Sequence, residues 1–460
     1  MTPYPARLAL AGGCAAVLAL AACSSGPSTN GLTPAAPGSS GSPAAGSPSP
    51  AAPAGGSPGA VIPGQPGAPP RIGGGLSPAQ LVAAYDTGPL YSRGITGKGQ
   101  TIVIVDPFGS PTIERDLAAY DKAWHLPAPP SFRVIAPAGP VPPFRPVGAR
   151  TGAAIETTLD VESAHLLAPG ASILLVETPT AETEGTAGFP EIVRAEEYVI
   201  RHHLGSVISM SLGATERTFP SRPSIMGLRS AFADASSGRN MITLVAASGD
   251  VGAAGLMLNG RTVYRTPQIG WPASDPLVIA VGGTQLGAQS PGTATAPATA
   301  WPESGGGRSV VFPRPRFQNS LAGIVGRTRG IPDISMDASC DSGLEMYATP
   351  GSVGSSRRWN VVCGTSLAAP LFAAVVALAD QQAGRPLGPI TPLLYHLAKI
   401  GDPGIIDVRG PGNTFSRDGT TVRGFPAGPG YDLVTGLGTI DAAKFVPDLA
   451  RLAQQELGGG

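Results

Sequence analysis

The chain has 460 residues, which is room for two or three average domains or for one large α/β domain with extra segments, and excludes a single small fold. Its 31 Lys and Arg residues balance its 31 Asp and Glu residues, so the chain has no net positive charge that would attract nucleic acid or an anionic membrane. Its 64 Gly and 50 Pro residues make up about a quarter of the chain, a share typical of low complexity. Part of the chain is therefore expected to be unfolded.

The low-complexity sequence lies at the amino end. No Asp, Glu, Lys, Arg or His occurs between Arg7 and Arg71. The apolar run behind Arg7 is too short for a comfortable membrane span and has the length of the apolar part of a secretory signal. Residues 24–70 are mostly Ala, Gly, Pro and Ser, and without a periodic apolar face nothing offsets the entropy of ordering them. We predict a signal peptide over 1–22 and a disordered tether over 23–75.

The signal ends in Leu20-Ala21-Ala22-Cys23, which resembles the bacterial lipobox, where the cysteine becomes the lipidated first residue of the mature protein. This resemblance predicts that Cys23 anchors the protein to the outer face of a bacterial cell membrane; ordinary cleavage, giving a secreted protein, is the alternative. A lipidated Cys23 leaves Cys340 and Cys363 as one pair in an oxidising compartment. These two residues form either a disulfide or two buried thiols.

The composition becomes globular at Leu76, where Ser77 and Pro78 precede a short apolar helix as an N-cap residue and an N1 proline. Apolar runs bounded by Gly, Pro or Asp then alternate with segments of helical period. An alternation of this kind is typical of a layered α/β fold with a parallel sheet. We predict strands over 101–105, 172–176, 206–212, 241–247 and 277–281, and helices over 114–124, 154–167, 191–203 and 225–235.

A later segment, residues 367–382, is apolar on nearly all sides, which predicts a helix through the core. We expect one folded domain over 76–453 and a flexible tail over 454–460. No phosphate-binding glycine motif is present in the sequence, which argues against nucleotide chemistry.

Three segments carry residues that are able to do chemistry. Glu156 and Asp160 are four residues apart on one predicted helix, so they lie on the same face. Two carboxylates there repel each other, unless they share a proton or both interact with a third group. Ser366 is in the first turn of the predicted core helix, where developing negative charge is favoured. Asp250 directly follows a predicted parallel strand. Taken singly, each segment also has an ordinary structural explanation. The pair Glu156 and Asp160 could lie on a solvated helix face, Ser366 could be an N-cap residue, and Asp250 could be a turn residue.

Taken together, the three segments resemble the sedolisins, or serine-carboxyl peptidases. The family's Glu-x-x-x-Asp helix matches Glu156 and Asp160, its Ser-Gly-Asp turn matches residues 248–250, and its Gly-Thr-Ser-x-x-x-Pro motif matches residues 364–370. The resemblance covers roughly residues 76–445. It implies a subtilisin-like fold, a three-layer parallel sheet with helices on both faces, and a serine-type endopeptidase that cuts a peptide or protein substrate at acid pH. Further matches are 76–85, 97–106, 280–284, 304–313 and 329–335.

The chemistry of the matched residues gives each of them a role. Ser366 would attack the peptide carbonyl, Glu156 would take its proton and Asp160 would orient Glu156. Asp250 would donate a hydrogen bond to the oxyanion, which requires a raised pKa. The resemblance also implies that Ser209, Ser211 and Gly213 line the substrate cleft as an edge strand that binds the peptide by β-addition.

The resemblance further implies one Ca²⁺ ion near the carboxyl end, because oxygen ligands and Gly-rich backbone suit calcium. A pair of ordinary Asp-containing turns is the alternative. The sequence departs from the family in having only the signal and tether before residue 76, and in the run Asp-Ala-Ser-Cys-Asp at 337–341. The matching calcium positions are Asp407, Val408, Gly428, Gly430 and Asp432.

Other functions are less well supported by the sequence. A subtilisin-type enzyme needs a His base, but none of the five histidines has the His-Gly-Thr context, although Asp106 at the first strand end would suit its acid. The only Gly-x-Ser-x-Gly match lies at 55–59 in the tether, which argues against a lipase. A catalytically inactive sedolisin fold that binds surfaces as a lipoprotein is the alternative from another class. We expect no nucleic-acid partner.

Overall fold

The computed structural model describes residues 75–287, 298–350 and 358–458. The predicted signal peptide, the Cys23 anchor and, apart from Gly75, the predicted tether lie outside the described residues. The first described helix, α1 (Pro78–Ala84), begins as the sequence predicts, with Pro78 at N1 and a capping box between Ser77 and Gln80. The Ser77 amide donates to Gln80 Oε1 at 3.0 Å, which satisfies a donor at the helix start.

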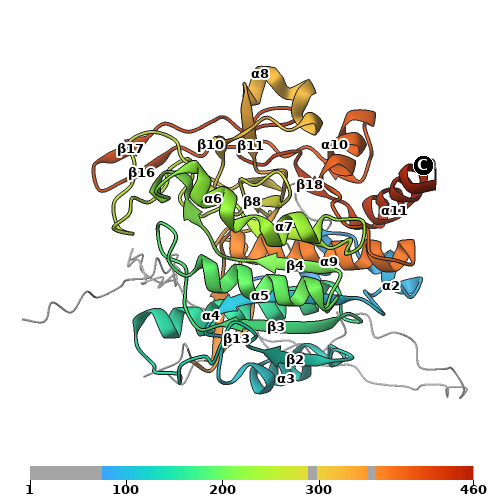
Figure 1. Ribbon diagram of the computed structural model, residues 1–460. Coiled ribbons are helices and arrows are strands. Elements are labelled where there is room, and N and C mark those ends of the chain that lie inside the picture. Colours follow the sequence, from blue (N-terminus) through green and yellow to red (C-terminus); the bar gives the residue numbers. More distant parts are fainter. Residues whose placement is uncertain (1–74, 288–297, 351–357, 459–460) are drawn as a thin grey trace, which may run out of the picture.

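A twisted central sheet forms the middle layer of the molecule (Figure 1). Its strands run parallel in the order β12-β8-β6-β4-β1-β3-β2, and the short β9 pairs antiparallel with β8. Most of these strands are buried on both faces, which explains their continuous apolar runs. They are β1 (Thr101–Pro107), β2 (Phe132–Ile135), β3 (Ser172–Thr178), β4 (Val207–Met210), β6 (Thr243–Ala247), β8 (Ile279–Gln285), β9 (Thr299–Ala300) and β12 (Ile334–Asp337).

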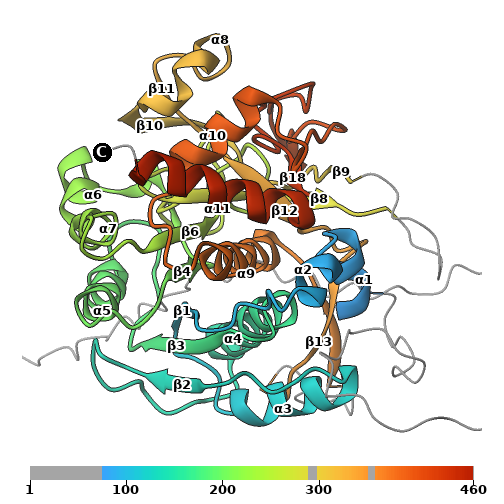
Figure 2. The same cartoon turned by 90° about the vertical axis from the view of Figure 1, so that its right-hand side faces the viewer.

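Helices cover both faces of this sheet, as the sequence predicts (Figure 2). One face is covered by α4 (Gly148–Leu167) and α9 (Thr365–Ala383), and the other by α5 (Phe189–Arg201) and α7 (Ser230–Ala235). The remaining described helices surround this sandwich and are α2 (Gly88–Ser92), α3 (Ile113–Trp124), α6 (Arg222–Leu228), α8 (Ala322–Val325), α10 (Thr391–Ile400), α11 (Ala442–Gly458) and the short 3₁₀ segments Glu216–Thr218 and Arg316–Leu321.

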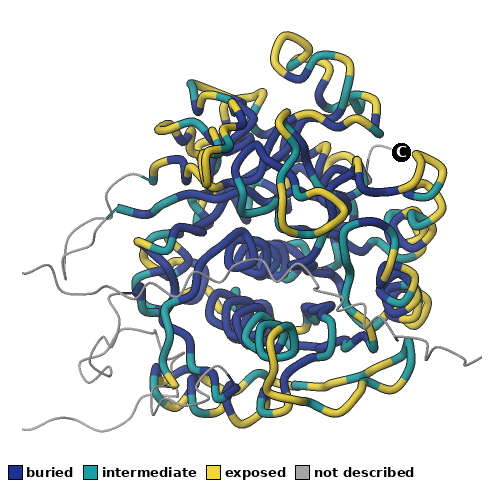
Figure 3. Tube along the Cα trace, turned by 90° about the vertical axis from the view of Figure 1, so that its left-hand side faces the viewer, coloured by how far each residue is buried: buried dark blue, intermediate teal, exposed yellow. Residues whose placement is uncertain are grey.

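Helix α9 runs through the core, between the sheet and α11 (Figure 2). The helical turns at the centre of the molecule are buried (Figure 3). Every residue from Thr365 to Asp380 is buried, which confirms the core helix predicted over 367–382. Within the described residues α9 is also the one helix long and apolar enough to cross a membrane, but most of its length is buried inside the molecule. Its apolar character is explained by this burial.

The predicted strands and helices all occur, with ends shifted by a few residues, except that 225–235 is divided into α6 and α7. The prediction was wrong at the tail, because α11 continues to Gly458 through Gln, Glu and Leu residues that favour helix.

Short antiparallel pairs of strands complete the fold outside the central sheet. They are β5 (Ala214–Thr215) with β7 (Gly270–Trp271), β10 (Gly307–Pro313) with β11 (Thr328–Ile331), β13 (Leu344–Tyr347) with β14 (Trp359–Val362), β15 (Ile405–Ile406) with β18 (Thr439–Ile440), and β16 (Phe415–Arg417) with β17 (Thr420–Val422).

Candidate active site

The order of the strands reverses at β1, and the candidate site lies at the carboxyl ends next to this point. The chain adds β2 and β3 on one side of β1, then β4, β6, β8 and β12 on the other. Ligands of open parallel sheets bind where the order reverses in this way. Asp106 is the second-last residue of β1, Ser211 follows β4 and Asp250 follows β6, so three polar side chains are brought to one edge of the sheet.

Helix α4 brings Glu156 and Asp160 to this edge. Asp160 is fully buried and its Oδ1 accepts a 3.0 Å hydrogen bond from the Ser211 hydroxyl. Burial raises the pKa of Asp160, and the charges of Asp106 and Glu156 raise it further. Burial also raises the pKa of Glu156, whereas the Ser366 hydroxyl, as a hydrogen-bond donor, lowers it. The pair is therefore not on a solvated helix face: Asp160 is buried and Glu156, which is partly buried, lies beside a serine.

The loop before α9 holds the two residues that precede Ser366, Gly364 and Thr365, against Asp250. Gly364 has φ +110°, a conformation that side chains rarely adopt, and a Cβ there would lie 2.7 Å from Asp250 Oδ2. Asp250 Oδ1 accepts hydrogen bonds from the amide and the hydroxyl of Thr365, both at 2.7 Å. Glycine at 364 is thus required both by the turn and by the close approach of the carboxyl. Ser366 itself is 3% exposed in the first turn of α9.

The protonation state of Asp250 is set mainly by burial. Burial raises its pKa to about 6, partly offset by the hydrogen bonds from Thr365, and the charge of Glu303 adds to the rise. Below that pH the carboxyl is protonated and able to donate a hydrogen bond. Thr365 donates to Oδ1, so Oδ2 is the oxygen without a hydrogen-bond donor in the described part of the chain, and it lies on the side of Gly364 and the nucleophile loop.

Asp106 belongs to this cluster, although the sequence suggested it only as the acid of a subtilisin-type enzyme. It is 1% exposed, and neither carboxyl oxygen has a hydrogen-bond partner among the described residues. Burial raises its pKa to about 7. A charged residue that directly follows a buried parallel strand is the sequence signal that could have identified it. Glu182, on the loop after β3, raises the pKa of Glu156 and was not identified either.

The predicted edge strand was wrong for Ser209. This residue lies within β4 and pairs with Ile104 of β1 on one side and Val245 of β6 on the other, so it is in the middle of the sheet and fully buried. The apolar run 206–212 does not reveal which strands flank it. Ser211 and Gly213 lie beyond the end of β4, and the Ser211 hydroxyl contacts the Ser366 carbonyl oxygen at 3.3 Å as well as Asp160.

Cys340 and Cys363 are joined by a disulfide in the structure. The bond closes the base of the β13–β14 hairpin, three residues before the nucleophile. Next to it the Gly364 amide donates to the Ala338 carbonyl at 2.7 Å. The sequence departure at 337–341 therefore lies directly beside the Ser366 loop.

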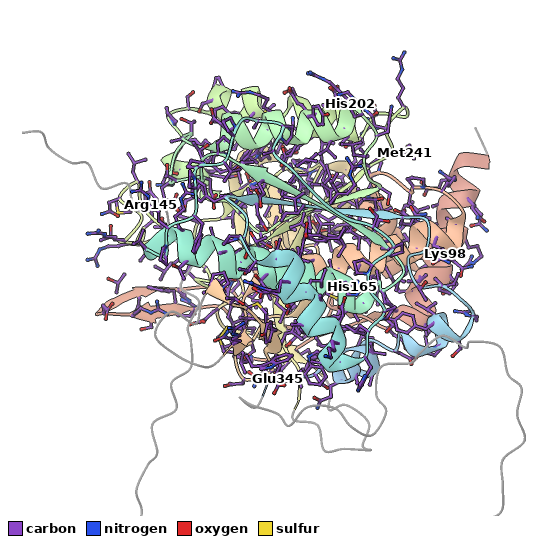
Figure 4. The ribbon with its side chains drawn as sticks, turned by 90° about the horizontal axis from the view of Figure 1, so that it is seen from below. Lys98, Arg145, His165, His202, Met241 and Glu345 are labelled. Atoms are coloured by element: carbon purple, nitrogen blue, oxygen red, sulfur yellow. A yellow bond between two sulfur atoms is a disulfide. The ribbon has the colours of Figure 1, made fainter. Side chains whose placement is uncertain are left out.

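Two of the five histidines, His165 and His202, have surroundings that do not include the serine. His165, on the far part of α4, is fully buried, and its Nε2 lies 3.2 Å from Asp121 Oδ1 and 2.9 Å from the Pro127 carbonyl (Figure 4). His202 follows α5 and is exposed. Neither histidine is on the helix that holds Ser366: His165 is on α4, which shares a face of the sheet with α9, and His202 follows α5 on the other face.

Two loops near the carboxyl end gather the residues predicted to bind calcium. Asp432 Oδ2 accepts from the Gly428 amide and Asp407 Oδ1 from the Gly430 amide, each at 3.0 Å. The Thr435 hydroxyl contacts the Val408 carbonyl at 3.2 Å and both Asp432 oxygens at 3.3 Å. These bonds bring the two loops together, and Asp407 Oδ2 also accepts from Arg409 Nε at 2.8 Å. Carboxylate and carbonyl oxygens are the ligand type that Ca²⁺ prefers. Among the described residues no three His, Cys, Asp or Glu side chains group to hold a metal, so backbone oxygens are needed.

Comparisons with known proteins agree with this fold and site. The sequence model of the subtilase family matches residues 150–392, which include α4, the Asp250 turn and the Ser366 motif. Kumamolisin from Bacillus sp. (strain MN-32) is 31% identical over 82% of this chain, and human tripeptidyl-peptidase 1 is 31% identical over 63%. Sedolisin from Pseudomonas sp. (strain 101) is 30% identical over 57%. The chain spans 64%, 51% and 43% of the lengths of these relatives, in that order.

Among solved structures, Pseudomonas sedolisin, a serine-carboxyl proteinase complexed with two molecules of pseudo-iodotyrostatin, matches with a TM-score of 0.68 and 26% identity. The match covers 84% of this chain and 99% of that one. The parallel sheet and the serine at the start of a core helix define a subtilase. Within that class, the chain belongs to the sedolisin family of serine-carboxyl peptidases.

Proposed function

We propose that this protein is a serine-carboxyl endopeptidase that hydrolyses peptide bonds at acid pH. The observation that carries the proposal is the contact of the Ser366 loop with carboxyl groups from two other elements. Asp250 accepts from Thr365 at 2.7 Å, and Ser211 joins Asp160 to the Ser366 carbonyl at 3.0 and 3.3 Å. No histidine is needed as the base, because Glu156 lies beside Ser366: burial raises the pKa of this carboxyl, and the serine hydroxyl lowers it in part as a hydrogen-bond donor.

The proposed mechanism assigns one role to each group. Glu156 takes the hydroxyl proton as Ser366 Oγ attacks the carbonyl carbon, and protonated Asp250 donates to the oxyanion that forms. Glu156 then gives the proton to the leaving amine, which leaves an acyl-enzyme. Water attacks this ester while Glu156 takes its proton, and the proton returns to Ser366 as the acid product leaves. Asp160, held by Ser211, orients Glu156 throughout.

Substitution of the nucleophile tests the proposal. The soluble domain, without the predicted signal, would be incubated with a denatured protein over pH 3 to 7, and the product masses would be measured. We expect cleavage by the parent and loss of at least about a thousandfold in kcat/KM for Ser366→Ala. Cleavage that Ser366→Ala does not reduce would contradict the proposal.

The alternative is a catalytically inactive fold that binds surfaces as a lipoprotein. The gathered Ser366, Glu156, Asp160 and Asp250 favour an enzyme, because a binding protein has no need to gather four polar groups, of which Ser366 and Asp160 are buried at a cost in stability. A parent domain that cleaves no peptide between pH 3 and 7, yet is folded, would favour this alternative.

We also propose one structural Ca²⁺ ion held by Asp407, Asp432 and the backbone oxygens of Val408, Gly428 and Gly430. The convergence of these loops supports it. When bound, the ion would neutralise the two carboxylates and hold the carboxyl-terminal loops against the core. Excess chelator should lower Tm, because a ligand that binds only the native state stabilises by mass action. Asp407→Asn should have a lower Tm that chelator no longer changes. An unchanged parent Tm, with no calcium by elemental analysis, would contradict the site.

The proposed location is the outer face of a bacterial cell membrane, with Cys23 as the lipid anchor, and the lipobox resemblance supports it. The full chain would be expressed in a bacterium and fractionated. We expect the parent in the membrane fraction and Cys23→Ala in the soluble one. Equal membrane association of both would show that Cys23 is not the anchor.

A further inference from the structure

The carbonyl of the nucleophile residue lacks the hydrogen bond that a helix normally supplies. Ser366 is in the first turn of α9, where its carbonyl oxygen would accept from the amide of the residue four positions later. That residue is Pro370, which lies inside the helix and has no N–H to donate. Ser366 is buried, so its carbonyl needs another donor, because an unpaired carbonyl away from water costs stability.

The Ser211 hydroxyl is placed to supply this bond. Ser211 follows β4 and is buried, and its Oγ lies 3.3 Å from the Ser366 carbonyl oxygen. The same Oγ lies 3.0 Å from Asp160 Oδ1 on α4. A hydroxyl has one proton, so Ser211 donates fully to only one of these two oxygens at a time. Which oxygen receives the proton depends on the state of Asp160.

Ionised Asp160 is an acceptor only, so it competes with the Ser366 carbonyl for the Ser211 proton. A hydrogen bond to a charged carboxylate is stronger than a hydrogen bond to a neutral carbonyl. Ser211 then donates to Asp160 Oδ1, and the Ser366 carbonyl is left without this donor. Ionisation of Asp160 therefore frees the first turn of α9 from the segment that follows β4.

Protonated Asp160 reverses this arrangement. Its hydroxyl can donate to Ser211 Oγ, so the Ser211 proton becomes available to the Ser366 carbonyl. Asp160 is fully buried, and the ionisable groups that act on it, Asp106 on β1 and Glu156 on α4, are both carboxyls. Burial and these neighbours raise the pKa of Asp160 well above its usual range, which favours the protonated arrangement at acid pH.

We propose that Ser211 is a positioning residue that replaces the helix bond removed by Pro370 and couples the proton on Asp160 to the position of Ser366. When the carbonyl is held, the first turn of α9 is fixed and the nucleophile keeps its place. Ser211 thus acts through the backbone of Ser366, in place of the substrate contact that the sequence resemblance implies. The inference deepens the proposed peptidase function and rests on it for the kinetic test, whereas the spectroscopic test needs no catalysis.

The kinetic test removes the Ser211 hydroxyl with and without the proline. Ser211→Ala should lower kcat about tenfold or more and change KM less than about twofold, because the nucleophile moves while the cleft is intact. Pro370→Ala provides an amide for the Ser366 carbonyl, so Ser211→Ala should cost less kcat in that background. Ser209→Ala is the matched control and should behave as the parent. Ser209 is on β4, two residues earlier, and its buried hydroxyl has no hydrogen-bond partner in the described part of the chain.

Two kinetic outcomes would overturn the inference. A raised KM with unchanged kcat in Ser211→Ala would make Ser211 a substrate contact. An equal loss of kcat on Ser211→Ala with Pro370 and with Pro370→Ala would show that the hydroxyl does not serve the carbonyl.

The spectroscopic test follows the Ser366 carbonyl directly. Protein with ¹³C at its serine carbonyls and ¹⁵N in its leucines gives a signal from the Ser366–Leu367 peptide, assigned by its absence in Leu367→Ile. Loss of a hydrogen bond lowers the carbonyl ¹³C shift, so we expect this shift to fall in the parent as pH rises from about 4 to 8 and Asp160 ionises. Ser211→Ala should have the low shift throughout, and Pro370→Ala the high shift.

A carbonyl shift that titrates equally in the parent and in Ser211→Ala would overturn the coupling. The expected shifts in a protein that cleaves no peptide would support the coupling and reject only the proposed function. The two proposals therefore fail separately.

Discussion

Asp250 has its two carboxyl oxygens in different surroundings. Oδ1 accepts two hydrogen bonds from Thr365, whereas Oδ2 faces the position where a Cβ of Gly364 would lie. A proton is therefore best placed on Oδ2, since Oδ1 is needed as an acceptor. Burial, which raises the pKa of Asp250 to about 6, keeps this proton in place at acid pH.

The first prediction concerns the alkaline side of the pH profile. Ionised Asp250 cannot donate, so the activity of the parent should fall as pH rises through about 6. Asp250→Asn keeps a donor and an acceptor but does not titrate, so its activity should persist to higher pH. Activity at low pH should still fall in both, because Glu156 must be ionised to act as base. The measurement is kcat/KM from pH 2 to 9.

Asp250→Ala is the control, because it has no donor at any pH and should lose about a hundredfold to a thousandfold in kcat. An alkaline limb in Asp250→Asn at the same pH as in the parent would mean that another group controls it. The assignment of Asp250 as the oxyanion donor would then be wrong.

At the scale of elements, the nucleophile is positioned by a hairpin as well as by a helix. The β13–β14 hairpin ends one residue before Cys363 bonds Cys340, and the Gly364 amide is bonded to the Ala338 carbonyl. Gly364 then turns the chain into α9. Any movement of the hairpin base is therefore transmitted to Thr365, whose amide and hydroxyl hold Asp250.

We predict that Cys340→Ser/Cys363→Ser lowers both stability and kcat. The bond closes a loop with a sequence separation of 23 residues, for which chain entropy gives about 3 kcal/mol. KM should change less than kcat, because the substrate contacts are elsewhere. Tm and steady-state kinetics would be measured, with reductant added to the parent as the matched comparison. Unchanged kcat in fully reduced parent would show that the hairpin does not position the serine.

At the scale of the whole molecule, buried carboxyls are unusually frequent. Asp106, Asp160, Glu162, Glu196 and Asp337 are at most 1% exposed, and burial raises the pKa of each. In the unfolded chain these groups ionise near their ordinary values, about 4. The folded state therefore binds more protons, and the free energy of unfolding should fall as pH rises from about 5 to 8. The fold is thus better suited to acid than to alkaline conditions.

Glu196 allows a direct measurement of this effect. It lies on α5, and neither of its oxygens has a hydrogen-bond partner among the described residues; burial raises its pKa to about 8. Glu196→Gln imitates the protonated form, so we expect it to match the parent at pH 5 and to be more stable, by at least about 1 kcal/mol, at pH 8. Denaturant unfolding at both values provides the measurement. Glu197→Gln, a neighbouring residue paired with Arg201, is the control, and an equal gain there would contradict the explanation.

The sequence alone determined the fold class and the chemical groups, because both depend on local patterns. Apolar runs such as 101–105 are buried on both faces of a parallel sheet, and residues 367–382 are apolar all round because α9 crosses the core. Glu156, Asp160, Asp250 and Ser366 were identified since they lie in short motifs whose order is specific. The tail was missed because a helix end depends on packing as well as on propensity.

The tertiary structure decided how these groups meet. Strand order is not encoded in any one strand, so the sequence could not show that Ser209 lies between β1 and β6 while Ser211 reaches Asp160. It also did not place Asp106 and Glu182 beside Glu156, because contacts between residues distant in sequence form only when the sheet closes around them. The raised pKa values follow from burial, a property of the assembled molecule rather than of any residue in it.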